Sequence, residues 1–130
     1  MIRPRACAAI IQNGKILMVL HRSPTREYWT LPGGGIENNE IPEQTIVREV
    51  KEETGLDVKT GKLLFLEPPE EYCFSAELTA SSDPVLGYDP EECDLPRISQ
   101  LLQDVAWLDL KEMREDRQVL KVISALGIEL

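Results

Sequence analysis

The order of apolar segments predicts a mixed α/β domain. Strand-like segments come first, an amphipathic helix and further strands follow, and a second amphipathic helix comes near the end. The chain has 130 residues, and a chain of that size buries roughly two thirds of its unfolded surface in one core. The sequence shows no internal repeat and no linker. We therefore expect residues 1–130 to form one domain.

The first strands are predicted on either side of a tight turn. Residues 5–11 form a short apolar run, and residues 15–20 form another after an Asn-Gly pair, which is typical of hairpin turns. Residues 21–30 are polar and aromatic, and we expect a loop there. Residues 31–35, LPGGG, are not expected to be helical, because proline lacks a backbone donor and glycine maximises backbone freedom.

Two helices and several strands are predicted after this segment. The first helix begins near Pro42, which suits a first turn, and ends at Gly55, which suits a C-terminal cap. The second helix has apolar residues at helical spacing and ends at Gly127. Residues 81–97 are rich in Pro, Asp, Glu and Gly and predict a long acidic loop, which in compact domains is often functional. The predicted strands are residues 56–58, 63–66, 72–78 and 105–108.

Charge and composition narrow the function classes. The chain has 14 Lys and Arg against 23 Asp and Glu, a net charge of −9, which argues against bulk nucleic-acid binding but not against a nucleotide substrate. No apolar run approaches the roughly 20 residues of a membrane helix, so no membrane partner is expected. Three cysteines without a CxxC spacing are typical of a reducing cytoplasm, where we expect the protein to reside.

The first predicted helix has an apolar stripe and an acidic side. At about 100° per residue, Glu49, Glu52 and Glu53 share one arc, and Glu53 borders the apolar stripe directly. Arg48 and Lys51 fall on the outer sides of this arc, away from its centre. The apolar stripe is predicted to contain Ile46, Val47, Val50 and the methyl group of Thr54.

Three carboxylates on one arc repel one another, and the one beside the stripe also loses hydration. Mg²⁺ or Mn²⁺ would remove both penalties, because hard cations bind several oxygen ligands. The alternative is an ordinary charged amphipathic helix in which Arg48 and Glu52 form an i, i+4 ion pair. The spacing of the charges leaves both interpretations open.

The segment GGIENNEIPEQTIVREVKEETGL resembles the Nudix box, G-x5-E-x7-R-E-U-x-E-E-x-G-U, in which U is aliphatic. Residues 28–33, YWTLPG, also resemble the usual approach to that box. The resemblance implies the Nudix fold, an α/β/α sandwich with a central mixed β-sheet. All nine specified positions match, at Gly34, Glu40, Arg48, Glu49, Val50, Glu52, Glu53, Gly55 and Leu56.

The Nudix resemblance implies a hydrolase that uses Mg²⁺ or Mn²⁺ and water to cleave the pyrophosphate bond of a nucleoside diphosphate linked to another moiety. That substrate would be a nucleoside triphosphate, a dinucleoside polyphosphate or a nucleotide sugar. The alternative is an inactive nucleotide sensor, although such proteins usually lose box glutamates that this sequence keeps. By resemblance, Arg48 orients the glutamates, and the cation ligands are the Gly33 carbonyl, Glu40, Glu49, Glu52 and Glu53, with Glu52 a further ligand or the base.

Other residues are candidates for substrate contacts. Tyr72 lies 16 residues past the box (72 − 56), near where diadenosine polyphosphate hydrolases of the family carry a tyrosine, but a strand tyrosine often serves packing. Tyr28 borders the expected cleft, and Arg22 and Arg26 are candidates for distal phosphates because arginine binds phosphate bidentately. We expect a small nucleotide-derived substrate. Homodimers are frequent in the family, and no segment decides for or against one.

The general base differs among family members, some of which use a glutamate of a later loop. In this sequence the candidates for that second role are Glu91, Glu92 and Asp94 in the acidic loop. The alternative for all three is plain solvation of an exposed loop.

Overall fold

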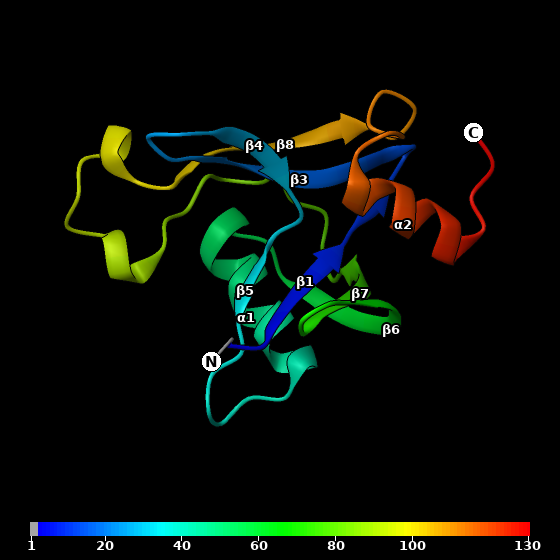
Figure 1. Ribbon diagram of the computed structural model, residues 1–130, viewed down its shortest axis with the longest axis horizontal. Coiled ribbons are helices and arrows are strands. Elements are labelled where there is room, and N and C mark those ends of the chain that lie inside the picture. Colours follow the sequence, from blue (N-terminus) through cyan, green and yellow to red (C-terminus); the bar gives the residue numbers. More distant parts are fainter. Residues whose placement is uncertain (1–2) are drawn as a thin grey trace.

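The computed structural model describes residues 3–130, which form two sheets and two helices (Figure 1). Within these residues, no helix is both long enough and apolar enough to cross a membrane. Short 3₁₀ turns lie at Pro90–Glu92 and Arg97–Ser99. The main elements in chain order are β1 (Arg5–Ala9), β2 (Ile11–Gln12), β3 (Lys15–Arg22), β4 (Glu27–Thr30), β5 (Gly33–Gly35), α1 (Pro42–Thr54), β6 (Val58–Glu67), β7 (Glu71–Leu78), β8 (Leu102–Asp109) and α2 (Arg117–Leu126).

The first sheet is mixed, with the strand order β5-β1-β7-β6. β1 and β7 run parallel, whereas β1 pairs antiparallel with β5, and β6 pairs antiparallel with β7. The second sheet is antiparallel and is centred on β3, which pairs with β2, β4 and β8. The chain therefore has the mixed α/β architecture that the order of its apolar segments predicts.

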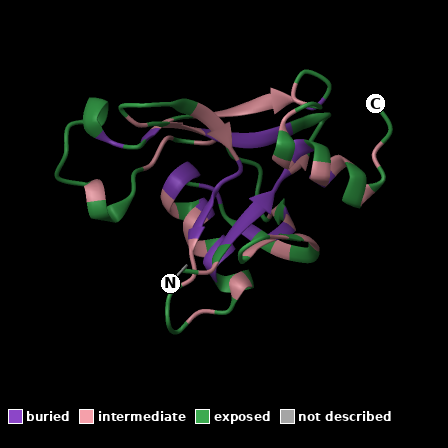
Figure 2. Ribbon diagram, viewed as in Figure 1, coloured by how far each residue is buried: buried purple, intermediate pink, exposed green. Residues whose placement is uncertain are grey.

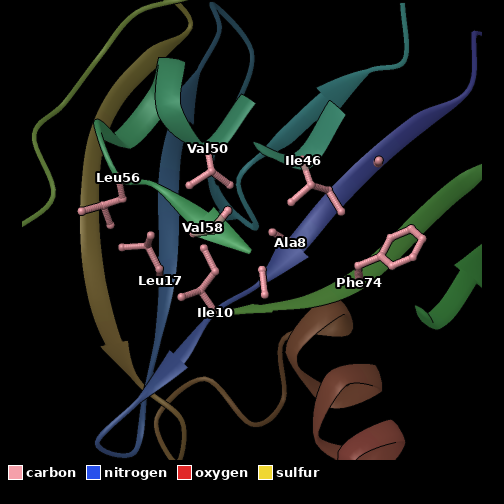
Figure 3. Packing of buried hydrophobic residues seen from close by; sticks show 10 residues of the cluster. Ala8, Ile10, Leu17, Ile46, Val50, Leu56, Val58 and Phe74 are labelled. Carbon is pink, nitrogen blue, oxygen red and sulfur yellow. The ribbon is translucent and has the colours of Figure 1, made fainter. Parts of the chain in front are cut away.

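β1 is buried on both faces, and this places it at the centre of the fold (Figure 2). Ala6 and Ala8 belong to a core cluster that includes α1, and Cys7 and Ala9 belong to a second cluster that includes α2. Because alternate residues of a strand face opposite sides of the sheet, the two helices cover opposite faces of β1. Figure 3 shows Ile46 of α1 close to Ala8 in the first cluster. This layering confirms the α/β/α sandwich.

The first helix begins and ends where the sequence indicates, and the second ends at the predicted glycine. α1 begins at Pro42, and Gly55 ends it in the left-handed conformation at φ 74°. At α2, the Asp116 side chain accepts hydrogen bonds from the backbone N–H groups of Gln118 and Val119. Gly127 ends α2 at φ 66°.

Several strands extend beyond their predicted bounds. Residues 21–30 are not one loop, because β3 continues to Arg22 and pairs with β4 across a short turn. The predicted strand at 63–66 lies within one long β6, which begins only at Val58, so residues 56 and 57 of the predicted strand at 56–58 are not in a strand. The pairing of β6 with β7 shifts register between Thr60 and Phe65. Polar edge strands and bulges lack the apolar alternation that reveals a strand in sequence.

The buried face of α1 is rotated from the predicted stripe toward the glutamates. Val47 was predicted to be buried, but it is 41% exposed, whereas Thr45 is fully buried and Glu53 is only 8% exposed. The hydroxyl of Thr45 donates to Glu40 Oε1 at 2.9 Å, which makes its burial tolerable. Ile46 is fully buried, as predicted. The acidic side of α1 therefore packs against the protein more closely than an amphipathic wheel indicates.

This rotation predicts that two neighbouring substitutions in α1 change the free energy of unfolding by very different amounts. Ile46→Ala is expected to lower the free energy of unfolding by about 2–5 kcal/mol, because it opens a cavity in the core. Val47→Ala, the matched control, is expected to change it by less than about 0.5 kcal/mol. Urea unfolding of both variants measures the difference, and equal losses would contradict the observed orientation of the helix.

Candidate functional site

A cleft of about 590 Å³ lies between α1 and strands of both sheets. One wall carries Glu49, Glu52 and Glu53 of α1, and the glycines of β5 lie beside them. Other parts of the wall come from β1, from β3 and β4, and from the segment between β7 and β8. The cleft is the place where the acidic side of α1 meets the rest of the protein.

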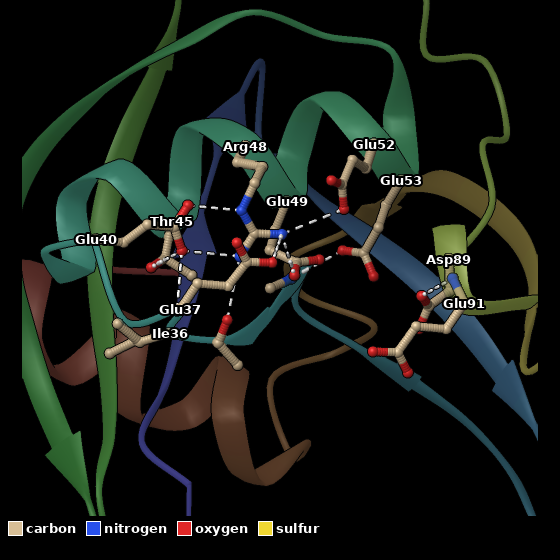
Figure 4. Close-up of polar contacts among 12 residues, drawn as sticks. Ile36, Glu37, Glu40, Thr45, Arg48, Glu49, Glu52, Glu53, Asp89 and Glu91 are labelled. Atoms are coloured by element: carbon tan, nitrogen blue, oxygen red, sulfur yellow. Dashed lines mark hydrogen bonds and ion pairs between the residues drawn. The ribbon is translucent and has the colours of Figure 1, made fainter.

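Arg48 forms a network with the carboxylates around it (Figure 4). Its Nε and Nη2 donate to the two oxygens of Glu40 at 2.6 and 2.9 Å. Nη1 lies 3.0 Å from Glu49 Oε1 and 3.4 Å from Glu52 Oε2, and Nη2 also donates to the Gly35 carbonyl at 3.1 Å. Arg48 is therefore at the centre of the acidic cluster, which corrects its predicted position on the outer side of the helix.

Glu40 is held firmly in this network. Besides Arg48, its carboxylate accepts hydrogen bonds from the Thr45 hydroxyl and from the Glu37 backbone N–H. The hydrogen bonds from Arg48 lower the pKa of Glu40 to about 2. The same pair raises the pKa of Arg48 above its ordinary range. Glu40 and Arg48 are thus both charged at any physiological pH, and Arg48 keeps a fixed orientation toward the cleft.

The glycines of β5 let the glutamates approach the sheet. The Gly33 backbone N–H donates to Glu53 Oε1 at 2.9 Å, a buried contact. A Cβ atom at Gly34 would lie 2.4 Å from Glu49 Oε1, closer than atoms can approach. A side chain at Gly34 would therefore displace the Glu49 carboxylate from its position against β5.

The segment between β7 and β8 is anchored to the end of α1. The backbone N–H of Val85 donates to the Thr54 carbonyl at 2.8 Å, and that of Gly87 donates to the Glu53 carbonyl at 2.9 Å. A Cβ atom at Gly87 would lie 1.7 Å from the Glu52 carbonyl oxygen, so only glycine fits this approach. The anchoring brings Asp89 and Glu91 to the cleft, on the same side as Glu53 in Figure 4.

The sequence matches the family model described as NUDIX domain over residues 1–125. The chain belongs to the Nudix family. Solved Nudix structures also share its fold, with TM-scores of 0.73 for a NUDIX hydrolase from Nitrosomonas europaea and 0.70 for an ADP-ribose pyrophosphatase from Streptococcus suis 89-1591. Both cover 98% of this chain, at 22% and 20% identity, and the matches span 89% and 94% of those chains.

Curated Nudix relatives match shorter segments. An 8-oxo-dGTP diphosphatase from Proteus vulgaris is 51% identical over 37 residues, which is 28% of this chain. An ADP-ribose pyrophosphatase from Methanocaldococcus jannaschii is 43% identical over 56 residues, which is 42% of this chain. Each match spans 33% of the relative's own length. The two relatives carry different substrate names, so the matches do not select a substrate.

Most predicted residues of the Nudix box meet in the cleft, which is lined by Gly33, Arg48, Glu49, Glu52 and Glu53, together with Tyr28. Four other candidates among the described residues are not part of its lining. Glu40 is engaged by Arg48, and Arg22 donates to Glu27 at 2.6 Å. Arg26 stacks over the Tyr28 ring at 4.2 Å, and the Tyr72 hydroxyl donates to Glu70 while its ring packs on the α1 side of the core.

The acidic loop contributes a different set of carboxylates than the sequence indicates. Glu91 lines the cleft, but Glu92 accepts a hydrogen bond from the Leu101 N–H, and neither Glu92 nor Asp94 is among the described lining residues. Asp89 does line the cleft and was not predicted. Its side chain caps the 3₁₀ turn by accepting from the Glu91 N–H at 2.9 Å, and this spacing is the sequence signal that was available.

Three further cleft residues come from parts of the sequence distant from the Nudix box. Arg3 and Arg5 reach the cleft from the beginning of the sheet. Gln118 reaches it from the first turn of α2, where its Oε1 accepts from the Thr30 hydroxyl and the Leu31 N–H. No local motif marks these residues, because only the packing of β1 and α2 brings them to the site.

Burial dominates the electrostatics of the two inner glutamates. It raises the pKa of Glu53 from 4.5 to about 8, and the nearby Glu49 carboxylate adds to the rise. Burial likewise raises the pKa of Glu49 to about 7, although Arg48 opposes the change. A divalent cation would favour the charged form of both groups, so the donor set fits a hard metal ion. Within residues 3–130, no group of three or more acidic, His or Cys side chains is arranged so that it could hold a metal ion.

The raised pKa of Glu53 predicts a pH dependence of stability for the metal-free protein. Between about pH 4.5 and 8 the carboxylate ionises in the unfolded state but stays protonated in the folded state, so stability falls as pH rises. Each pKa unit corresponds to about 1.4 kcal/mol, and the whole contribution is on the order of a few kcal/mol. Glu53→Gln is therefore expected to become more stable than the wild type as pH rises through this window.

Urea unfolding in EDTA from pH 5 to pH 9 measures this effect. Glu77→Gln is the matched control, because Glu77 is exposed on β7 and far from the acidic cluster in sequence. The stability difference between the wild type and Glu77→Gln should stay nearly constant with pH. A constant difference for Glu53→Gln as well would show that Glu53 has an ordinary pKa.

Proposed function

We propose that this Nudix domain is a pyrophosphohydrolase that acts, with Mg²⁺ or Mn²⁺, on a nucleoside diphosphate linked to another moiety. The observation that carries the proposal is the burial of Glu53 beside Glu49 at the glycine strand β5, within a cleft large enough for a small molecule. A buried Glu53 and a half-buried Glu49, both with raised pKa values, are costly for stability and are typical of a functional site.

Each residue of the box has a role that follows from its contacts. Glu49, Glu52 and Glu53 would hold the cation, together with the Gly33 carbonyl at the edge of β5. A bound Mg²⁺ or Mn²⁺ supplies charge neutralisation for the diphosphate and lowers the pKa of a water molecule. Because both oxygens of Glu40 are engaged, Glu40 would act by holding Arg48.

Arg48 would orient Glu49 and Glu52, with which it forms hydrogen bonds. The cleft also offers a carboxylate for proton transfer from water. Besides the box glutamate Glu52, the candidates are Asp89 and Glu91, which the anchored loop places in the lining. The reaction then needs positioning and charge stabilisation more than covalent chemistry, and a rigid carboxylate cluster provides both.

Hydrolysis of a substrate panel tests the proposed activity. Nucleoside triphosphates, dinucleoside polyphosphates, ADP-ribose and nucleotide sugars are incubated with Mg²⁺ or Mn²⁺, and the released phosphate or pyrophosphate is measured. We expect turnover of at least one class, complete loss of turnover in EDTA and recovery when the cation is returned. Turnover that survives full chelation would contradict the metal role, and ligand binding without any turnover would favour a sensor.

A substitution at Glu53 separates catalysis from folding. Glu53→Gln is expected to keep the fold, because the amide fits the same space, and to lower kcat by orders of magnitude, because it removes a charged ligand. Glu77→Gln should keep wild-type turnover. Circular dichroism checks the fold of both variants. Wild-type turnover in folded Glu53→Gln would exclude Glu53 from the metal site.

A further inference from the structure

The charge next to β5 changes sign within three residues. Gly33 donates to Glu53, and a Cβ atom at Gly34 would collide with the Glu49 carboxylate. At Gly35, in contrast, a Cβ atom would lie 2.6 Å from Arg3 Nε. Because neighbouring residues of a strand face opposite sides of the sheet, the Glu49 carboxylate and the Arg3 guanidinium lie on opposite faces of β5, and both line the cleft.

Arg5 belongs to the same end of the cleft. In the sheet register, Arg5 on β1 pairs with Gly35 on β5 and with Glu71 on β7. Arg5, Arg3 and Glu71 all line the cleft. The two guanidinium groups therefore bring positive charge to this end of the cleft, opposite in sign to the glutamates of the α1 wall.

The guanidinium of Arg5 has few partners in the protein. Its ion pair with Glu71 spans 3.9 Å, and within residues 3–130 its side chain forms no hydrogen bond. Arg3 donates one hydrogen bond, from Nε to the Ile36 carbonyl at 3.3 Å. Arg48, by comparison, is occupied by Glu40 and its neighbours. Arg5 thus keeps most of its five N–H donors for a ligand that enters the cleft.

We propose that Arg5, with Arg3 beside it, binds a further phosphate group of the substrate, next to the diphosphate at the α1 wall. This inference rests on the proposed function and narrows it: the preferred substrate carries three or more phosphates in a row. The neutral sugar of ADP-ribose or of a nucleotide sugar would leave both guanidinium groups without an anion. Arginine recognises phosphate through two parallel charge-assisted hydrogen bonds, which gives this contact its strength.

Arg22 and Arg26, the two candidates for phosphate binding from the sequence, have other partners. Arg22 is bound to Glu27, and Arg26 covers the face of the Tyr28 ring. Of the described residues, neither arginine lines the cleft. We therefore assign phosphate binding to Arg3 and Arg5 at the beginning of β1, and not to the residues beside the turn between β3 and β4.

A binding measurement tests the inference without turnover. Calorimetry with Mg²⁺ compares inorganic tripolyphosphate with pyrophosphate for the wild type, Arg5→Gln and Arg114→Gln. Arg114 is an exposed arginine in a separate hollow with Lys111, so its variant changes the net charge equally. We expect the wild type and Arg114→Gln to bind tripolyphosphate about tenfold or more tightly than pyrophosphate.

Arg5→Gln should lose this preference and keep its affinity for pyrophosphate. Three results would overturn the inference: a wild type with no preference for tripolyphosphate, an Arg5→Gln variant that keeps the preference, or an equal loss of affinity for both probes. Arg5→Lys should restore part of the preference, because the charge returns without the planar fork.

A kinetic comparison then separates this inference from the proposed function. In a turning-over enzyme, Arg5→Gln should lower kcat/KM for a nucleoside triphosphate about tenfold or more and leave kcat/KM for ADP-ribose nearly unchanged. If the Arg5-dependent binding preference is found and no substrate is hydrolysed, the phosphate site stands and the hydrolase proposal fails. If hydrolysis is found and Arg5→Gln affects both substrates equally, the hydrolase proposal stands and the phosphate site fails.

Discussion

The contact between the acidic side of α1 and the glycine strand β5 is the constraint on which the site depends. Glu49 comes close to the backbone of β5 because Gly34 has no side chain, Gly33 lets β5 lie close to β1, and the Gly33 N–H binds Glu53. The same contact rotates α1, so that Thr45 is buried and Val47 is exposed. Arg48 stabilises this arrangement by holding Glu40 on one side and Glu49 on the other. Sterics and charge together fix the helix against the sheet.

This arrangement lowers the stability of the metal-free protein, but it holds the carboxylates in place for a cation. Burial raises the pKa of Glu53 and Glu49, which means that their charged forms are unfavourable until a cation compensates them. The fold supports the site from behind through β1, whose alternate residues pack on both helices. It supports the rim through Gly87, which ties the acidic loop to the end of α1. Strand β1 and the anchored loop therefore hold Glu49 and Glu53 in a fixed arrangement, as a preorganised site requires.

The sequence predicted the parts of the molecule that local signals determine. Pro42 and Gly55 marked the ends of α1, and the spacing of the Nudix box placed Glu49, Glu52 and Glu53 on one side. The helical wheel predicted the wrong location for the Arg48 guanidinium, because the long side chain bends toward the glutamates and does not follow the direction of its Cβ atom.

The remaining site residues depend on tertiary packing. Arg5 and Gln118 are far from the box in sequence, and they enter the cleft only because β1 pairs with β5 and α2 packs near Thr30. Asp89 depends on the anchored loop in the same way. No periodicity within a short window contains this information. Candidates chosen by composition, such as Arg22 and Arg26, consequently lie outside the cleft lining in the part of the chain that the structure describes.

Glu49 and Glu53 are proposed to form a cation site against β5. Anomalous diffraction from crystals of the protein grown with Mn²⁺ tests it most directly. We expect an anomalous peak in the cleft between Glu49, Glu53 and the Gly33 carbonyl, and we expect this peak to be absent from crystals of Glu53→Gln. A saturated crystal without a peak there, with Arg48 still paired to Glu49 and Glu53 still bonded to Gly33, would contradict it.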